Sequence, residues 1–268
     1  MTRTELISFI HNQKSFLCIG LDSDINKIPK HLLNEEDPIF SFNKSIIDAT
    51  KDLCVAYKPN IAFYESLGVS GWDSLRKTLD YIPKSHFTIA DAKRGDIGNT
   101  SAMYAETFFK TFPFNGVTVS PYMGKDSIQP FLDWKDNWTI ILALTSNSGA
   151  DDFERIQTIS GNSLYEHILK TASSWASSEQ LMFVAGATRI EELRKLRSII
   201  PDYFLLIPGV GVQGGNLKEV IESSITKDIG ILVNASRSIL YASEGFDFAD
   251  AARQESKKIQ SEMVNYIY

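Results

Sequence analysis

The chain has 268 residues, of which 43% are hydrophobic and 22% charged, and it carries a formal net charge of −6. This composition is typical of a soluble globular protein and is long enough for one large domain or two small ones. The acidic balance argues against a non-specific nucleic-acid binder, because such a protein needs a basic face to displace the counterions of the polymer. A single nucleotide remains compatible with this charge as a ligand.

The chain begins with a predicted amphipathic helix. Residues 1–16 read MTRTELISFIHNQKSF, and they space Leu6, Ile7, Ile10 and Phe16 as one face of a helix does. No long apolar run is present in this segment. We therefore expect neither a signal peptide nor a transmembrane span, no membrane partner, and a cytoplasmic location.

Eight short apolar runs alternate with helix-length segments along the rest of the chain. The runs have the length of buried strands and cover residues 16–23, 55–63, 87–93, 116–123, 139–146, 182–188, 204–211 and 230–238. Between them, segments such as 39–53, 101–112, 163–176, 189–200 and 214–224 space apolar residues three and four apart, as helices do. Strand followed by helix, eight times, predicts an α/β fold, a single (β/α)8 TIM barrel over residues 1–268, with an open doubly wound sheet as the alternative.

The longest loop candidate covers residues 147–163 and follows the fifth run. It is longer than most connections in compact domains. We expect this segment to be either a lid or an irregular part of the barrel rim.

Three consecutive predicted strands end in charged residues. In a parallel barrel alternate residues point inward, and active sites lie at the C-terminal ends of the strands. By this alternation Asp22 ends the first strand, Lys58 ends the second, and Asp91 and Lys93 end the third. Each charge taken singly is also compatible with a solvated strand end. Together they predict a preorganised electrostatic site, because charges of alternating sign offset one another's desolvation and determine which groups stay ionised.

A glycine-rich turn follows the seventh strand and an arginine follows the eighth. Residues 208–216 read PGVGVQGGN, and residues 234–238 read NASRS with Arg237 at the fourth position. The loops after strands seven and eight of such barrels often hold a phosphate through backbone N–H groups. Glycines allow the chain to approach an anion closely, and Arg237 could add a charge-assisted contact. The two segments together predict a phosphate site.

Metal centres and nucleophile triads have little support. The four histidines, His11, His31, His86 and His167, are scattered, and none ends a predicted strand. A histidine-based metal site or a Ser-His-Asp triad is therefore not expected. Lys93 could in principle form a Schiff base, but the carboxylates on both sides of it favour a protonated lysine.

The most specific motif is residues 91–100, DAKRGDIGNT, with an Asp-x-Lys-x-x-Asp core. Together with AYKPNIAFYE (56–65), SPYMGKDSIQPF (120–131), LTSNSGA (144–150), PGVGVQGG (208–215) and SRS (236–238), it resembles the orotidine 5′-phosphate decarboxylases, most closely their longer bacterial branch. The match follows the strands in order from the first to the eighth, with one departure at Ser148, where that branch usually has proline. The resemblance implies a TIM barrel that converts orotidine 5′-monophosphate to uridine 5′-monophosphate in pyrimidine biosynthesis, without metal or other cofactor.

The resemblance also implies roles for the charged residues. Lys93 would protonate the C6 carbon of the pyrimidine as carbon dioxide leaves, and Asp91 would stand beside the substrate carboxylate. Lys58 would link the ribose hydroxyls to the charge array, and Asp22 would also bind the ribose. Asp96 would reach the site of a partner subunit together with Thr100, which implies a homodimer with composite sites.

The remaining substrate contacts implied by the resemblance surround the base and the phosphate. Ser146 would hydrogen-bond the pyrimidine edge, and Gln213 would bridge the base and the phosphate. The phosphate would be held by Arg237 with the backbone at Ser236, and by the glycine-rich turn that includes Pro208 and Gly214.

Two other functions share parts of this pattern. The metal-dependent sugar-phosphate decarboxylases and synthases, which resemble 3-keto-gulonate-phosphate decarboxylase, share the barrel and the Asp-x-Lys-x-x-Asp core. They usually carry a glutamate at the end of strand two to help hold Mg²⁺, whereas this chain has Lys58 there, whose charge would repel a cation. A catalytically silent nucleotide-binding barrel would keep the phosphate loops and lose the charged array, but this chain has both.

Overall fold

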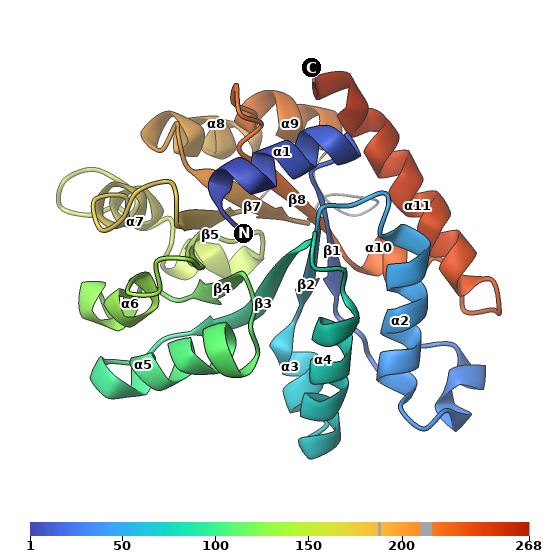
Figure 1. The fold of residues 1–268 in the computed structure, drawn as a ribbon. Coiled ribbons are helices and arrows are strands. Elements are labelled where there is room, and N and C mark those ends of the chain that lie inside the picture. Colours follow the sequence, from blue (N-terminus) through green and yellow to red (C-terminus); the bar gives the residue numbers. More distant parts are fainter. Residues whose placement is uncertain (187–188, 210–215, 268) are drawn as a thin grey trace. The chain divides into compact units, whose positions relative to one another are not determined.

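Eight parallel strands close a barrel in chain order from β1 to β8, with helices between successive strands (Figure 1). The computed structural model describes residues 1–186, 189–209 and 216–267. The strands are β1 (Leu17–Leu21), β2 (Ala56–Pro59), β3 (Phe87–Arg94), β4 (Gly116–Val119), β5 (Trp138–Leu144), β6 (Leu181–Ala185), β7 (Phe204–Pro208) and β8 (Ile231–Ala235). The predicted (β/α)8 fold is therefore confirmed, and the doubly wound alternative is wrong because an open sheet would leave two unpaired edges.

The helices between and around the strands also follow the predicted order. They are α1 (Arg3–Gln13), α2 (Pro38–Thr50), α3 (Ile61–Glu65), α4 (Val69–Tyr81), α5 (Gly98–Glu106), α6 (Lys125–Leu132), α7 (Leu164–Ala172), α8 (Ile190–Ile199), α9 (Leu217–Ser224), α10 (Arg237–Leu240) and α11 (Phe248–Met263). Short 3-10 turns are η1 (Lys30–Asn34), η3 (Ser148–Asp152) and η4 (Val264–Tyr266), and η2 (Thr107–Thr111) is a π-helical turn. No helix among the described residues is both long enough and apolar enough to cross a bilayer.

The chain divides into two compact units. The first unit comprises Met1–Ile7 and Lys93–Asn234, and the second comprises Ser8–Ala92 and Ala235–Tyr268. In the first unit β4 to β8 pair in parallel, and in the second β1 pairs with β2 and β2 with β3. The single domain over 1–268 stays a prediction.

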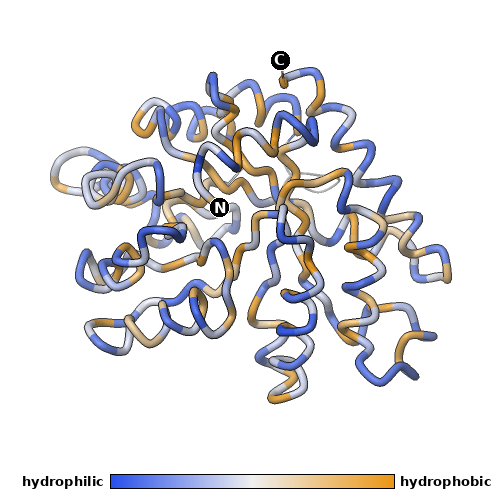
Figure 2. The backbone as a smooth tube through the Cα atoms, in the orientation of Figure 1, coloured by the Kyte–Doolittle hydropathy of each residue, from blue (hydrophilic) through white to orange (hydrophobic). Residues whose placement is uncertain are grey.

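The strands are buried along their length rather than on one face only. Every residue of β1, β2, β4, β6 and β8 is buried. Parallel strands covered on both faces read as continuous apolar runs, which is why run length rather than strict alternation predicted them. The outer helices are amphipathic, and Figure 2 shows hydrophobic and hydrophilic residues alternating along them. In α8, for example, Leu193 and Leu196 are buried whereas Glu191 and Arg194 are exposed.

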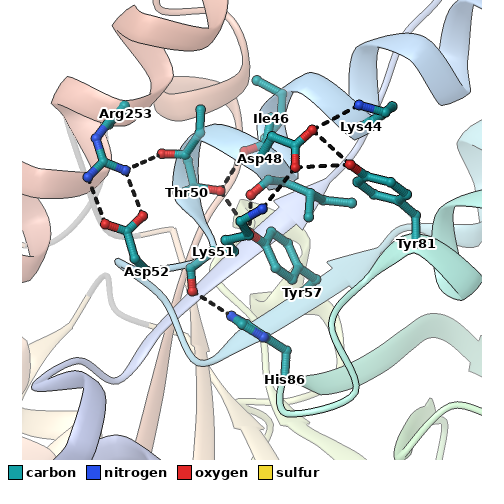
Figure 3. A network of polar contacts seen from close by, with 12 residues as sticks. Lys44, Ile46, Asp48, Thr50, Lys51, Asp52, Tyr57, Tyr81, His86 and Arg253 are labelled. Atoms are coloured by element: carbon teal, nitrogen blue, oxygen red, sulfur yellow. Dashed lines mark hydrogen bonds and ion pairs between the residues drawn. The ribbon is translucent and has the colours of Figure 1, made fainter.

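A polar network surrounds the C-terminal end of α2 in the second unit (Figure 3). The Thr50 hydroxyl donates to the Ile46 carbonyl over 2.7 Å and lies 2.8 Å from the buried Tyr57 hydroxyl. The Tyr57 hydroxyl also lies 3.3 Å from the Ile47 carbonyl oxygen, to which it can donate. At the periphery Arg253 of α11 forms two hydrogen bonds with Asp52, of 2.6 and 2.7 Å. The network therefore combines one fully buried hydroxyl pair with one exposed ion pair.

These two contacts should differ in their contribution to stability. Tyr57→Phe should lower the free energy of unfolding by about 1 kcal/mol, because it removes a buried hydrogen bond. Asp52→Asn should lower it by at most about 0.5 kcal/mol, because the side chains of the Arg253–Asp52 pair are 40% and 56% exposed. Urea unfolding of both variants beside the wild type measures the difference. An equal or larger loss in Asp52→Asn would contradict this account.

Candidate active site

A buried ammonium group lies between two carboxylates in the second unit. Lys58 Nζ is 2.8 Å from Asp91 Oδ2 and 3.8 Å from Asp22 Oδ1, and Lys58 is only 4% exposed. Burial opposes the charged form of Lys58, but the charges of Asp91 and Asp22 outweigh it and raise the pKa above its usual value. The amine therefore stays protonated. These three residues, predicted from strand alternation, are brought together by the fold.

Strand register explains why these charges meet. Gly20 of β1 is opposite Lys58 of β2, and Asn60, just after β2, bridges in parallel to Asp91 of β3. Asp22 follows the last residue of β1 directly. Within the described residues Asp22 Oδ1 is buried and accepts no hydrogen bond. A buried carboxylate oxygen in that state can accept a hydrogen bond from a ligand hydroxyl.

Tyr241 is a site residue that the sequence did not indicate. Its hydroxyl donates to the Asp22 carbonyl over 2.8 Å and accepts the Asp24 N–H over 2.8 Å. Burial raises the pKa of Tyr241 to about 12, so the hydroxyl keeps its proton at neutral pH. Because Tyr241 directly follows α10, it ties the end of β1 to the segment after β8. A tyrosine behind a short helix carries no sequence signal for this contact.

Lys93, near the end of β3 in the first unit, has a strained backbone. Its φ is 48°, in the left-handed region that non-glycine residues rarely occupy. Its N–H donates to the hydroxyl of Thr118 in β4 over 2.9 Å, and Thr118 is buried. Such strain persists only where the surrounding structure holds it, and it is concentrated at functional sites. Thr118 was missed because a threonine inside an apolar strand reads as a core residue.

The rest of the 91–100 motif leaves the strand. Asp96 lies in the loop after β3 and accepts the N–H of Ile97 over 2.7 Å, and Thr100 lies exposed in α5. Arg94, to which the resemblance assigns no role, stacks its guanidinium over two rings, with its central carbon 5.3 Å from the centre of Tyr104 and 5.4 Å from that of Phe108. Arg94 therefore helps to pack the strand against the helix that follows it.

Ser146 and the end of β7 are neighbours in the first unit. Ser146 is exposed just after β5, and a Cβ placed on Gly209 would lie 3.7 Å from its Oγ. Pro208 is the last residue of β7 and is opposite Asn234 of β8. Gly209 has a φ of 83°, which its residue type permits. The predicted residues Gln213 and Gly214 lie outside the described residues.

The segment after β8 belongs to the second unit. Ser236 precedes α10, and Arg237 begins it with an exposed side chain. Within the described ranges the Arg237 guanidinium forms no ion pair or hydrogen bond with another side chain. This cation can accept an anionic ligand without first breaking a protein contact.

No group of three or more histidine, cysteine, aspartate or glutamate residues is arranged to hold a metal ion in the described part of the chain. The two carboxylates that converge, Asp22 and Asp91, have the Lys58 ammonium as their common partner.

Comparisons with known proteins find one recurring family. The Orotidine 5′-phosphate decarboxylase / HUMPS family model matches residues 15–253. A protein named orotidine 5′-phosphate decarboxylase from Flavobacterium johnsoniae is 56% identical over 270 residues, covering 100% of this chain and 98% of that protein. One of the same name from Christiangramia forsetii is 53% identical, covering 99% and 98%. The solved structure of Leishmania donovani OMP decarboxylase aligns with a TM-score of 0.83 at 31% identity, covering 98% of this chain and 99% of that one.

Proposed function

The chain belongs to the orotidine 5′-phosphate decarboxylase / HUMPS family, and we propose that it converts orotidine 5′-monophosphate to uridine 5′-monophosphate in pyrimidine biosynthesis. The reaction is that of a carbon–carbon lyase and uses no metal or other cofactor. The observation that carries the proposal is the buried Lys58 ammonium between Asp22 and Asp91, of which Asp91 lies on β3 two residues before Lys93. The proposed location is the cytoplasm.

The chemistry requires stabilisation of a carbanion. Cleavage of the bond between C6 and the carboxylate releases carbon dioxide and leaves the electron pair on C6, in the ring plane, with no adjacent carbonyl to accept it. In the proposal the Lys93 ammonium faces C6, stabilises the developing charge and then donates its proton to that carbon. Preorganised charges contribute a large share of the barrier reductions of roughly 8–23 kcal/mol seen across enzymes. The left-handed backbone of Lys93 supports a functional role for this residue.

The carboxylates have separate tasks in this mechanism. Asp91, kept ionised by Lys58, would stand beside the substrate carboxylate, and their repulsion would be relieved as carbon dioxide leaves. Asp22 would accept a hydrogen bond from a ribose hydroxyl. The support for this contact is the buried Asp22 Oδ1, which lacks a hydrogen-bond donor among the described residues.

The base and phosphate subsites complete the proposal. Ser146 would contact the pyrimidine edge, and Gln213 would bridge the base and phosphate. Arg237 would hold the phosphate with the backbone at Ser236 and the turn that includes Pro208 and Gly214. The exposed Arg237 side chain, which has no ion-pair or hydrogen-bond partner among the described residues, supports this assignment. Binding energy from a non-reacting phosphate can be used to exclude water and orient the base.

The active form in this proposal is a homodimer in which Asp96 and Thr100 complete the site of the partner subunit. Support comes from three exposed apolar side chains. Ile97, next to Asp96, is 56% exposed, and Met103, in the same helix as Thr100, is also 56% exposed. Tyr122, in the loop between β4 and α6, is 86% exposed. Clustered apolar exposure of this kind is typical of an interaction surface. A second copy of the chain would remove these side chains from water.

Lys93→Ala should reduce turnover by at least about 10²-fold, the usual contribution of a positioned proton donor. The loss of orotidylate absorbance measures the rate, with a chelator present throughout. The exposed Lys84→Ala serves as the matched control and should keep wild-type turnover. Full activity in Lys93→Ala would exclude it as the proton donor. Wild-type activity that disappears with chelator and returns with Mg²⁺ would instead favour the metal-dependent decarboxylases.

Mixing Lys93→Ala with Asp96→Ala should restore activity that neither variant has alone. Each hybrid dimer would have one site with both native residues, so random exchange should restore ~25% of wild-type activity. Native mass spectrometry of the mixture verifies subunit exchange. Hybrid dimers that form but remain inactive would show that Asp96 does not act across an interface.

A further inference from the structure

The 147–163 segment carries a residue that acts on the base subsite. We propose that Glu154 is a positioning residue, which holds the backbone of Thr145 and Ser146 in place and so orients Ser146 toward the pyrimidine. This inference rests on the proposed function, which assigns the pyrimidine contact to Ser146. Of the two roles expected for the segment, the proposal assigns it the support of the barrel rim rather than that of a lid.

The Glu154 carboxylate contacts both the backbone N–H and the side-chain hydroxyl of Thr145. Its Oε2 accepts the Thr145 N–H over 2.7 Å, and its Oε1 lies 2.9 Å from the Thr145 hydroxyl oxygen. Thr145 is the first residue after β5 and directly precedes Ser146. The single Thr145 hydroxyl proton is shared between Glu154 and Asn147, whose Oδ1 is 2.6 Å away. Hydrogen bonds to a carboxylate are the stronger class, so Glu154 is the main anchor of this turn.

Gly186 restricts the next peptide, which joins Thr145 to Ser146, by close packing. A Cβ placed on Gly186 would lie 2.8 Å from the Thr145 carbonyl carbon and 2.9 Å from the Ser146 nitrogen. The Gly186 N–H also donates to the carbonyl of Leu144, the last residue of β5, over 2.8 Å. Thr145 is therefore held by hydrogen bonds to Glu154, and the peptide that joins it to Ser146 packs closely against Gly186, while the Ser146 side chain stays exposed.

Glu154 and the adjacent Arg155 each have a contact with a helix, Glu154 with α7 and Arg155 with α8. Its carbonyl accepts the N–H of Tyr165 in α7 over 2.9 Å. The adjacent Arg155 forms two hydrogen bonds with Glu192 of α8, of 2.8 and 2.9 Å, and its side chain is only 13% exposed. A bidentate arginine–carboxylate pair of this kind holds a defined geometry. The middle of the segment is thus attached to the helices that follow β5 and β6.

The proposal predicts a loss that is specific to ligands with a base. In Glu154→Ala the Thr145 N–H loses its acceptor and Ser146 loses its fixed orientation. The Kd for uridine 5′-monophosphate should rise about 5- to 30-fold, which corresponds to about 1–2 kcal/mol of binding free energy. The Kd for ribose 5-phosphate, which has no base, should change less than about twofold, since its subsites do not involve Ser146. Glu154→Gln, which keeps one oxygen acceptor, should recover part of the nucleotide affinity.

The matched control is Glu166→Ala. Glu166 is a buried glutamate at the start of α7 that accepts the Ser163 N–H over 2.9 Å and pairs with Lys195. Its loss should lower the thermal unfolding temperature without changing either Kd. Thr145→Val, which removes the hydroxyl but keeps the N–H, provides a second test of the contact and should weaken nucleotide binding less than Glu154→Ala.

Isothermal titration of each folded variant with the two ligands distinguishes the outcomes. An unchanged Kd for uridine 5′-monophosphate in Glu154→Ala would overturn the proposal, and so would an equal loss of affinity for both ligands, which indicates general loosening. If Glu154→Ala does not fold, unchanged nucleotide affinity in both Glu154→Gln and Thr145→Val overturns it. The wild type is assayed with orotidine 5′-monophosphate in the same preparation. Absence of decarboxylation there would contradict the proposed function itself, separately from the role of Glu154.

Discussion

The site depends on the buried ion contact between Lys58 and its two carboxylates. Asp22 and Asp91 converge in a region where their side chains are only 20% and 11% exposed. Two carboxylates in such a position can both remain ionised only if a cation compensates their desolvation and mutual repulsion. Lys58 supplies that cation from the protein itself. The chain therefore builds an array of alternating charge, in which one ammonium group lies between two carboxylates.

Within each of the two units, backbone contacts do much of the positioning. Tyr241 holds the carbonyl of Asp22 and the N–H of Asp24, so the carboxylate between them projects from a fixed turn. Thr118 accepts the N–H of Lys93 and helps to keep its left-handed backbone. Glu154 does the same for the turn at Thr145. Residues that contact the backbone next to the proposed site residues thus help to orient them, and such precision is what electrostatic preorganisation requires.

The barrel and the charge array could both be predicted from the sequence alone. A parallel barrel has a strict inward alternation and a preferred functional end, so Asp22, Lys58 and Asp91 could be assigned to one rim from their positions alone. The predicted runs extended beyond most strands because the apolar character continues into the first loop residues. The strand 116–119, for example, was predicted to reach residue 123.

The supporting residues could not be predicted, because their contacts join segments that only the fold brings together. Tyr241 lies 217 residues after the backbone that it holds. Glu154 is only nine residues from Thr145, but it lies in a loop whose path no periodicity describes. The left-handed conformation of Lys93 is equally hidden, since lysine does not favour it.

The central claim is that the Lys58 ammonium creates the catalytic array. The most direct measurement is kcat/KM for orotidine 5′-monophosphate in Lys58→Met, which keeps the length of the side chain and removes its charge. The account predicts a folded protein whose kcat/KM is lower by at least about 10²-fold, because two facing carboxylates are left without a cation. A folded Lys58→Met variant with kcat/KM close to that of the wild type would contradict it.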